Sequence, residues 1–302
     1  MPAWTQAPWR IRKDPVRALI IMLLVSAGAH AASADTPSLI ERGRYLIHAG
    51  GCITCHTADE PDAPPLAGGR ALPTPFGTFY PPNLTPDPET GLYNWTDTDF
   101  SHALREGRAP DGRLYYPAFP YPSYTGLDDA DVAAIAAYLR SLPPVRRATP
   151  PHDLPWYLSF RPIMYGWNLL NFRPHRFVPD GNQSPAWNRG AYLVRHLGHC
   201  GECHSPRNRL GGIDEAAALG GNPDGPDGDK VPDITQDRTT GIGIWSRDEI
   251  LLFLEMGMLP NGDFAGSSMG AVIDDNTSQL TPADREAIAT YLQTIGQPAE
   301  LP

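Results

Sequence analysis

The amino-acid sequence predicts an all-α protein built from two tandem domains. One observation behind this prediction is an internal repeat, in which related segments return about 150 residues later. The other is a series of signals for the start and end of helices, without the alternating apolar and polar runs typical of strands. The chain has 302 residues, enough for two domains of ordinary size, and its 34 Pro and 29 Gly residues indicate long loops.

The repeat extends over most of each half of the chain. Two glycines, Gly43 and Gly190, lie in the first repeated segment. Because glycine has no Cβ, each would permit a close approach between two helices. The repeated segments are Arg42–Leu46 with Arg189–Leu193, Asn83–Asp87 with Asp233–Asp237, and Ala134–Leu139 with Ala287–Leu292.

Five segments carry a residue that typically caps a helix ahead of an apolar stretch. Capping residues accept hydrogen bonds from the free backbone N–H groups of the first turn, and Pro is favoured at the first helical position. The expected helix starts are the capping boxes Ser38 with Glu41 and Ser246 with Glu249, then Asp97, Asp128, and Thr281 followed by Pro282.

Residues 1–34 are expected to be a secretory signal peptide. Basic residues precede an apolar run from Ala18 to Gly28, and small residues follow up to Ala34. The apolar run is shorter than a membrane span needs, although a retained N-terminal anchor is the alternative. The signal predicts export to the periplasm. The formal net charge of −10 makes nucleic acid an unfavourable partner.

All four cysteines of the chain lie in two Cys-x-x-Cys-His units. The first consists of Cys52, Cys55 and His56, and the second, with the same spacing, consists of Cys200, Cys203 and His204. This pattern is typical of covalent attachment of a c-type haem, with the cysteines bonded to the haem vinyl groups and the histidine on the iron. A zinc site or a redox disulfide would leave the two histidines unexplained. The sequence therefore predicts two covalently bound haems.

The predicted helices and haem units resemble the class I cytochrome c fold, repeated twice. The resemblance implies a first domain at residues 35–145, an interdomain strap at 146–186 and a second domain at 187–302. The strap is rich in proline and aromatic residues, so we expect it to pack across both domains rather than to hang free.

In a class I domain the second axial iron ligand is a methionine thioether, and Met269 stands where that ligand is expected for the second haem. The position 150 residues earlier is Phe119, which cannot bind iron. The sequence therefore does not identify a sixth ligand for the first haem iron: either another residue replaces the methionine, or this coordination position is open. The remaining candidates are Met164, His48, His102, His152, His175 and the tyrosines Tyr115, Tyr116, Tyr121 and Tyr124, while Met256 and Met258 are rivals of Met269.

Several longer strings resemble the cytochrome c subunits of periplasmic alcohol and gluconate dehydrogenases. Such subunits commonly carry three haem motifs and often a C-terminal membrane helix, whereas this chain has two motifs. The strings that carry the resemblance are Pro73–Thr78, Asn83–Asp87, Ala103–Gly107, Tyr116–Tyr124, Trp167–Leu170 and Gly198–Asn208.

The resemblance implies a di-haem electron-transfer protein of the periplasm. A dehydrogenase of the alcohol, aldehyde or sugar-acid type would donate electrons, and an oxidase or small cytochrome of the respiratory chain would accept them. Membrane association is expected only through a partner. The alternatives are a di-haem peroxidase that uses an open first haem, opposed by the lack of a clear acid–base group, and a gas or redox sensor.

Overall fold

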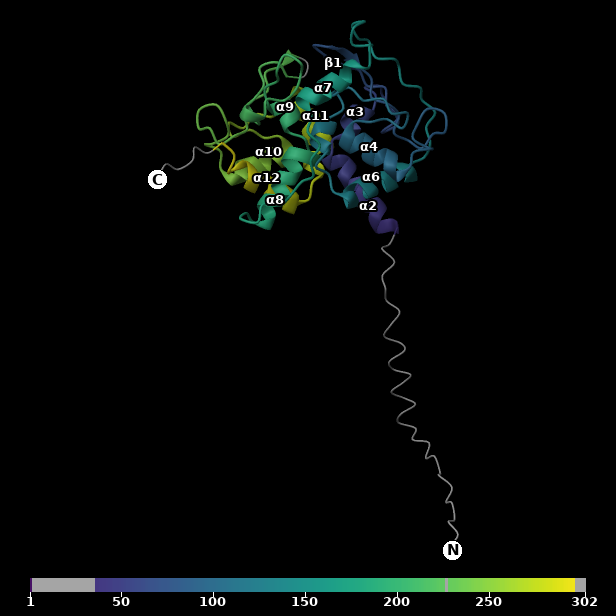
Figure 1. Ribbon diagram of the computed structural model, residues 1–302. Coiled ribbons are helices and arrows are strands. Elements are labelled where there is room, and N and C mark those ends of the chain that lie inside the picture. The colour runs from purple at the N-terminus through teal and green to yellow at the C-terminus, as the bar shows by residue number, and fades with distance from the viewer. Residues whose placement is uncertain (2–35, 226–227, 297–302) are drawn as a thin grey trace. The chain divides into compact units, whose positions relative to one another are not determined.

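The structure is a computed structural model that describes residues 1, 36–225 and 228–296 (Figure 1). Backbone contacts divide the chain into residues 1–38 and residues 39–302, and the second of these units contains both Cys-x-x-Cys-His motifs. The signal peptide expected at residues 1–34 lies outside the described part apart from Met1. It therefore remains a prediction from the sequence.

Helices are the main regular elements of the described residues, and long loops connect them. The helices with α labels are α2 (Thr36–Ala49), α3 (Cys52–His56), α4 (Asp97–Glu106), α5 (Tyr121–Tyr124), α6 (Asp129–Ser141), α7 (Ile163–Asn171), α8 (Pro185–Tyr192), α9 (Gly201–His204), α10 (Arg247–Met256), α11 (Ser267–Asp275) and α12 (Pro282–Leu292). A π-helix η1 (Leu193–Leu197), short 3₁₀ turns η2 (Glu215–Ala217) and η4 (Thr277–Gln279), and two strands, β1 (Leu72–Thr74) and β2 (Gly77–Phe79), complete the set.

The two strands form an antiparallel hairpin, which corrects the all-α expectation. Leu72 pairs with Phe79, and the Thr74 hydroxyl donates a hydrogen bond of 2.7 Å to the Gly77 carbonyl across the turn. Gly77 has a φ of 118°, a value that side chains with a Cβ rarely adopt. Each strand has three residues, which is too short for an alternating pattern to be recognised in the sequence.

Three of the predicted helix starts are confirmed. Ser246 and Glu249 form a capping box at the start of α10, and Asp128 is the residue ahead of α6. Thr281 caps α12 by accepting a hydrogen bond from the backbone N–H of Asp284, with Pro282 in the first turn.

Two of the predicted helix starts are wrong, one by a single residue and the other by three residues. Thr96, rather than Asp97, caps α4, because its hydroxyl forms a reciprocal capping box with Asp99. Helix α2 begins at Thr36, so Ser38 lies inside the helix instead of ahead of it. Both errors are small because neighbouring Ser, Thr and Asp residues compete for the same capping position.

The hydrogen-bonding pattern of the loops repeats along the chain. Turns at corresponding positions of the two halves are closed by the same backbone hydrogen bonds. The repeat seen in the sequence is therefore also a repeat of backbone structure. The matched pairs are Leu92 N to Thr85 O with Ile242 N to Thr235 O, both 2.9 Å, and Tyr115 N to Gly107 O (2.7 Å) with Ala265 N to Gly257 O (2.9 Å).

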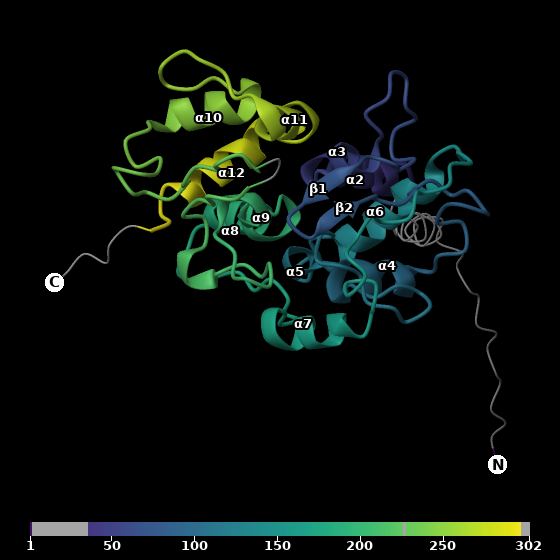
Figure 2. The ribbon, with the colours of Figure 1, turned by 90° about the horizontal axis from the view of Figure 1, so that it is seen from above.

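In each half, the first and last helices cross at a glycine. A Cβ at Gly43 of α2 would overlap the Ala134 carbonyl oxygen of α6. A Cβ at Gly190 of α8 would overlap the Ala287 carbonyl oxygen of α12 in the same way. The expectation that these glycines permit a close helix crossing is confirmed. Figure 2 shows α8 and α12 on one side of the unit and α2 and α6 on the other.

The segment expected to be a strap packs on both halves, as predicted. Helix α7 lies in this segment, at the edge of the ribbon in Figure 2. The indole N–H of Trp167 donates a 2.7 Å hydrogen bond to the Leu210 carbonyl of the second half. Tyr121 of the first half donates its hydroxyl proton to the Asn168 side-chain oxygen. Met164 and Trp167 are buried in an aromatic cluster with Tyr121.

None of the helices within the described ranges has both the length and the apolar character that crossing a membrane requires.

We predict that Gly43→Ala destabilises the protein by about 2–3 kcal/mol, because the new methyl group must push α2 away from the Ala134 carbonyl. Chemical denaturation would measure the loss. The matched control is Gly166→Ala in α7, where a Cβ meets no atom within 4 Å and where Ala should be neutral or stabilising by up to about 1 kcal/mol. Equal effects of the two substitutions would contradict the role assigned to the crossing.

Candidate functional site

The first Cys-x-x-Cys-His motif forms the short helix α3. Cys52 opens the helix and Cys55 lies one turn later, so the two thiols share a face, and His56 is the last residue. The preceding residue, Gly51, has a left-handed backbone with a φ of 63°. This sharp turn separates α3 from the end of α2 and sets the direction of the motif.

The second motif has the same construction with one difference. Cys200 precedes α9, and Cys203 and His204 complete the motif within it. The residue ahead of Cys200 is His199, which is left-handed with a φ of 40°. A side chain with a Cβ in this conformation costs of the order of 1 kcal/mol relative to glycine. The surroundings of His199 must therefore stabilise it.

Both motif histidines are held in the orientation and tautomer that a metal ligand needs. The Nδ1 atom of His56 lies 2.8 Å from the Pro82 carbonyl oxygen, and Nδ1 of His204 lies 2.8 Å from the Pro232 carbonyl oxygen. Because a carbonyl oxygen only accepts, each Nδ1 carries the proton and each Nε2 keeps a free lone pair. Burial lowers the pKa of His56 to about 4 and also lowers the pKa of His204, so both rings are neutral at pH 7.

The four cysteines are free thiols in the structure. Burial raises the pKa of Cys52 and of Cys200 to about 12, and that of Cys203 to about 11. Protonated thiols beside a neutral histidine fit addition across the vinyl groups of a haem, after which the sulfur atoms are thioethers that carry no charge. The donor set and its geometry therefore fit a c-type haem at each motif.

Met269 lies in the first turn of α11 rather than in a loop, and it is partly buried. Helix α11 contacts α10 of its own half and also α3 of the first motif. The structure therefore brings the segment that carries Met269 to the contact between the halves. Its role as the ligand of the second haem iron remains a prediction. Met256, one of its two rivals, is the exposed last residue of α10, and Met258 follows the helix.

Phe119, the counterpart of Met269, lies among aromatic rings. Its ring centroid is 5.6 Å from that of Tyr115 and 5.7 Å from that of Tyr124. Burial raises the pKa of Tyr115 to about 12 and raises the pKa of Tyr124 well above its ordinary value. Both phenols are therefore neutral at pH 7, and Phe119 packs against two uncharged aromatic side chains.

The other candidate ligands of the first haem each have a different environment in the structure. Met164 is buried in the aromatic cluster beside Trp167. The Nδ1 of His48 contacts the Asp275 carbonyl oxygen. The Nε2 of His102 lies 3.9 Å from the Oε1 of Glu106. The Nδ1 of His152 accepts a hydrogen bond from the backbone N–H of Tyr80. The ring of His175 lies against that of His196. These contacts select none of them as a ligand.

The two motifs meet through Tyr124, His199 and Gly50. The Tyr124 hydroxyl donates a 2.8 Å hydrogen bond to the Gly50 carbonyl, just ahead of the first motif. The His199 Nε2 lies 3.2 Å from the same carbonyl, and the Tyr124 and His199 rings meet edge to face with centroids 5.4 Å apart. These contacts hold His199 in its left-handed conformation and connect the residue before Cys200 to the chain before Cys52.

Two more hydrogen bonds connect the motifs to the opposite half. Glu202, inside the second motif, accepts a 2.8 Å hydrogen bond from Ser123 of α5. Thr54, inside the first motif, donates a 3.0 Å hydrogen bond to Asp275 of α11. The helices α5 and α11 occupy corresponding places in the repeat, so each half places the same segment against the motif of the other.

The second half contains one extra residue between its first repeated segment and its motif. Ten positions separate Arg42 from Cys52, whereas eleven separate Arg189 from Cys200. The structure accommodates the extra residue as the π-helix η1, in which the Gly198 N–H bonds the Leu193 carbonyl at 2.7 Å. The comparison of spacings could have revealed this insertion from the sequence.

The Asp284 carboxylate forms hydrogen bonds to residues of both halves, a contact that the sequence analysis did not predict. Arg189 of its own half donates to both carboxylate oxygens at 2.8 and 2.7 Å, and the Tyr45 hydroxyl of the other half donates at 2.6 Å. Burial alone would raise the pKa of Asp284, but these donors outweigh that effect and lower it.

Asp131 repeats this arrangement in the opposite direction. Arg42 of its own half bonds one carboxylate oxygen, and Tyr192 of the other half donates its hydroxyl proton to the second at 2.6 Å. Tyr45 and Tyr192 thus each bind a carboxylate of the opposite half. The signal that could have identified their partners is the Ala-Asp pair that recurs as Ala130-Asp131 and Ala283-Asp284.

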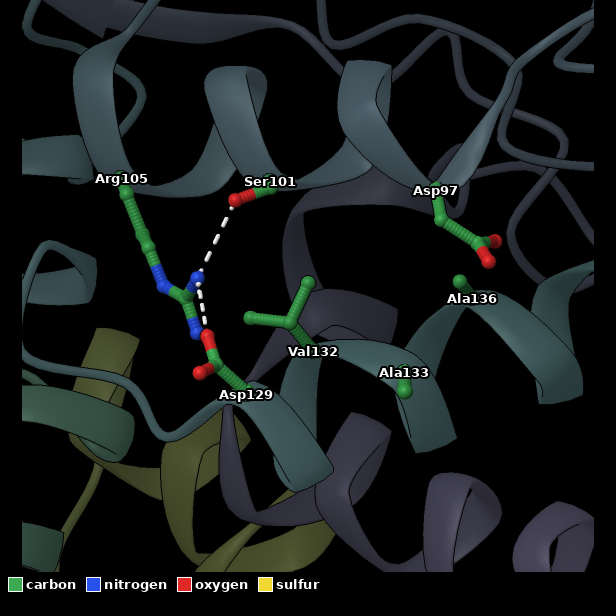
Figure 3. A pocket seen from close by; sticks show the side chains of 7 residues that line it. All are labelled: Asp97, Ser101, Arg105, Asp129, Val132, Ala133 and Ala136. Atoms are coloured by element: carbon green, nitrogen blue, oxygen red, sulfur yellow. Dashed lines mark hydrogen bonds and ion pairs between the residues drawn. The ribbon is translucent and has the colours of Figure 1, made fainter.

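A surface pocket between α4 and α6 lies apart from the residues of the two motifs. Figure 3 shows the Arg105 guanidinium between Ser101, at 3.1 Å, and Asp129, at 2.7 Å. Its cavity volume is about 180 Å³, and its walls include helix-packing residues such as Val132. We interpret it as part of the contact between α4 and α6.

Comparison with known protein families matches residues 40–143 to the family model of cytochrome c. A di-haem c-type cytochrome of Cereibacter sphaeroides is 44% identical over 259 residues, which are 84% of this chain and 85% of that protein.

Two relatives are parts of dehydrogenases by name. A nicotinate dehydrogenase subunit of Pseudomonas putida is 40% identical over 300 residues, 98% of this chain and 24% of that protein. The gluconate 2-dehydrogenase cytochrome c subunit of Pantoea cypripedii is 36% identical over 289 residues, 92% of this chain and 65% of that protein. The chain therefore spans less than two thirds of each of these two relatives.

We predict that Asp284→Asn lowers the free energy of unfolding by about 2 kcal/mol at pH 7, because Arg189 loses the charge that faces it. The folded-state pKa of Asp284 is below its unfolded value of about 3.9, so the stabilisation is complete above that pH and is lost as the pH falls through the folded pKa. Denaturation curves of wild type and variant should therefore converge below about pH 4.

The matched control for this prediction is Asp263→Asn, at an exposed carboxylate whose Oδ1 accepts a hydrogen bond from the Phe264 N–H, which an amide oxygen could also accept. We expect a change within about 0.5 kcal/mol for the control at every pH. A difference between wild type and Asp284→Asn that stays constant down to pH 2 would show that the Asp284 charge does not carry the effect.

Proposed function

Because this chain belongs to the c-type cytochromes, we propose that it is an electron-transfer protein that binds two haems covalently, one at each Cys-x-x-Cys-His motif. The observation that carries the proposal is the repeated setting of His56 and His204. Each follows a pair of protonated thiols, and each points its Nδ1 proton at a backbone carbonyl 2.8 Å away. Two sites of the same construction imply two haems in two tandem class I domains, at 35–145 and 187–302, joined by the segment 146–186.

When bound, haem supplies a one-electron couple between ferric and ferrous iron. The residues of this chain supply the proximal ligands, the neutral tautomer that binds iron, and an apolar environment. We propose Met269 as the distal ligand of the second haem, because a thioether favours ferrous iron and raises the reduction potential. Phe119 would leave the first haem without this thioether, so the first haem would have the lower potential and accept electrons first.

We propose a dehydrogenase as the electron donor. The support is that relatives with 36–40% identity are named as subunits of nicotinate and gluconate dehydrogenases. The acceptor would be an oxidase or a small cytochrome of the respiratory chain, and the export signal expected at residues 1–34 would place the exchange in the periplasm.

The alternative function, a di-haem peroxidase, gains no support from the residues around Phe119. Cleavage of a peroxide bond needs a positioned group that moves protons. The rings that contact Phe119 belong to Tyr115 and Tyr124, which burial keeps protonated at neutral pH.

The decisive experiment is to count the haems on the purified protein. We expect the denatured protein to exceed its polypeptide mass by two haem groups, and its alkaline pyridine spectrum to show two c-type haems per chain. Cys200→Ser combined with Cys203→Ser should remove one of them. Potentiometric titration of the wild type should give two one-electron steps. A protein with the mass of the polypeptide alone would overturn the proposal.

We predict that Met269→Ala converts one ferric haem from low to high spin and lowers its reduction potential by about 0.1 V or more, because axial ligands set haem potentials over a range of about 0.8 V. Electron paramagnetic resonance and potentiometry measure the two effects. Met256→Ala, at an exposed methionine nearby in the sequence, is the matched control and should change neither. A shift in the control alone would assign the thioether to Met256.

A further inference from the structure

The outer face of α7 and the chain leading into it expose an unusual amount of apolar surface. Seven of the fifteen large apolar side chains exposed among the described residues lie within residues 156–170. Trp156 is 85% exposed, Leu169 is 72% exposed, and Phe160 and Leu170 are each 67% exposed. With Ile163, these residues define what we call the α7 face. A concentration of exposed apolar side chains within one short segment is typical of an interaction surface.

Helix α7 is apolar on both of its sides. Its inner side buries Met164 and Trp167 in the aromatic cluster, and its outer side presents Ile163, Leu169 and Leu170 to solvent. A helix that needed only to pack on the protein would carry polar residues on its outer side. The outer side of α7 is therefore suited to a second apolar environment.

The charge around the α7 face is opposite to that of the whole chain. The chain has a net charge of −10, yet Leu154–Pro179 is its longest stretch without Asp or Glu and contains Arg161, Arg173 and Arg176. Arg176 pairs with Asp129 at 2.8 Å. Neither Arg161 nor Arg173 forms an ion pair with any carboxylate of the described ranges. The Arg161 guanidinium lies over the Tyr116 ring, 3.9 Å from the ring centroid, whereas Arg173 is exposed and places its positive charge at the border of the apolar face.

We propose that the α7 face binds the surface of an anionic phospholipid bilayer. Tryptophan, phenylalanine and aliphatic residues on one face, with an exposed arginine at its border, are the composition of segments that lie in the interface of a membrane. The exposed Arg173 side chain can extend to a lipid phosphate while its stem stays on the apolar surface. This attachment is independent of the proposed electron transfer, and it gives the chain its own route to a membrane, which the sequence led us to expect only through a partner.

The observations favour a lipid surface over a protein partner as the occupant. Protein interfaces obtain most of their binding energy from aromatic and arginine side chains, whereas Leu is under-represented among those residues. Here the aliphatic residues Leu169 and Leu170 are among the most exposed. Gly166 lies between Ile163 and Leu169 in the sequence, and a Cβ added to it would have no other atom within 4 Å. Such an open aliphatic surface fits the acyl boundary of a bilayer.

The test is flotation of the haem-loaded protein with vesicles of phosphatidylethanolamine and phosphatidylglycerol. We expect wild type to float with these vesicles, and Leu169→Ser combined with Leu170→Ser to reduce the binding constant by at least about tenfold, since partitioning scales with the apolar area buried. Arg173→Glu should weaken binding to anionic vesicles, and added salt should do the same to wild type.

Ile244→Ser, at an equally exposed apolar residue of the second half, is the matched control and should bind as wild type does. Haem absorption and denaturation midpoints of each variant verify that it is folded. Failure of wild type to float, equal binding to neutral phosphatidylcholine, or equal loss in the control would overturn the proposal. So would a wild-type dimer that the double substitution converts to monomers, because a second copy would then cover the α7 face.

Discussion

Two helix crossings, each made at a glycine, set the positions of the other parts of the structure. At Gly43 and Gly190 the backbone of one helix contacts a carbonyl of another, and this closeness directs the end of the first helix of each half toward its motif. Only glycine fits there, because any Cβ would overlap the carbonyl oxygen. The Asp131 and Asp284 carboxylates, near the start of the second helix of each crossing, then receive an arginine from the same half and a tyrosine from the other. The crossing thus determines both the fold of a half and its contact with the other.

The sequence was a good guide wherever the structure depends on neighbouring residues. The Ser246 capping box and the Thr281-Pro282 start follow from local hydrogen bonding, so their residues identify them directly. The Cys-x-x-Cys-His motifs are equally local, and each motif forms a short helical turn in the structure. The β1–β2 hairpin was missed because its strands are too short for a period to be visible and its pairing depends on the turn at Gly77.

The contacts between the halves could not be predicted in the same way, since they join residues far apart in the sequence. Tyr45 and Asp284 are separated by 239 positions, and the repeat alone does not show whether such pairs form within a half or between halves. His199 is a clearer example. In isolation its left-handed backbone is unfavourable, and contacts with the Tyr124 ring and the Gly50 carbonyl of the other half stabilise it. A local rule applied to His199 predicts the wrong residue type for its position.

Several departures from the repeat lie around the two motifs, and this has a physical reason. Packing of the crossing helices requires both halves to keep glycine, arginine and aspartate in matching places, so these positions cannot diverge without loss of stability. The motif surroundings have no such constraint. There the halves differ by an extra residue in η1, by His199 in place of Gly51, and by Phe119 opposite Met269 in the repeat. One frame therefore presents two chemically different environments to what we propose are two haems. Unequal surroundings produce unequal reduction potentials, because ligand identity and burial both tune an iron centre. An electron carrier with two identical sites would lack a preferred direction, and the asymmetry within this duplicated frame would provide one.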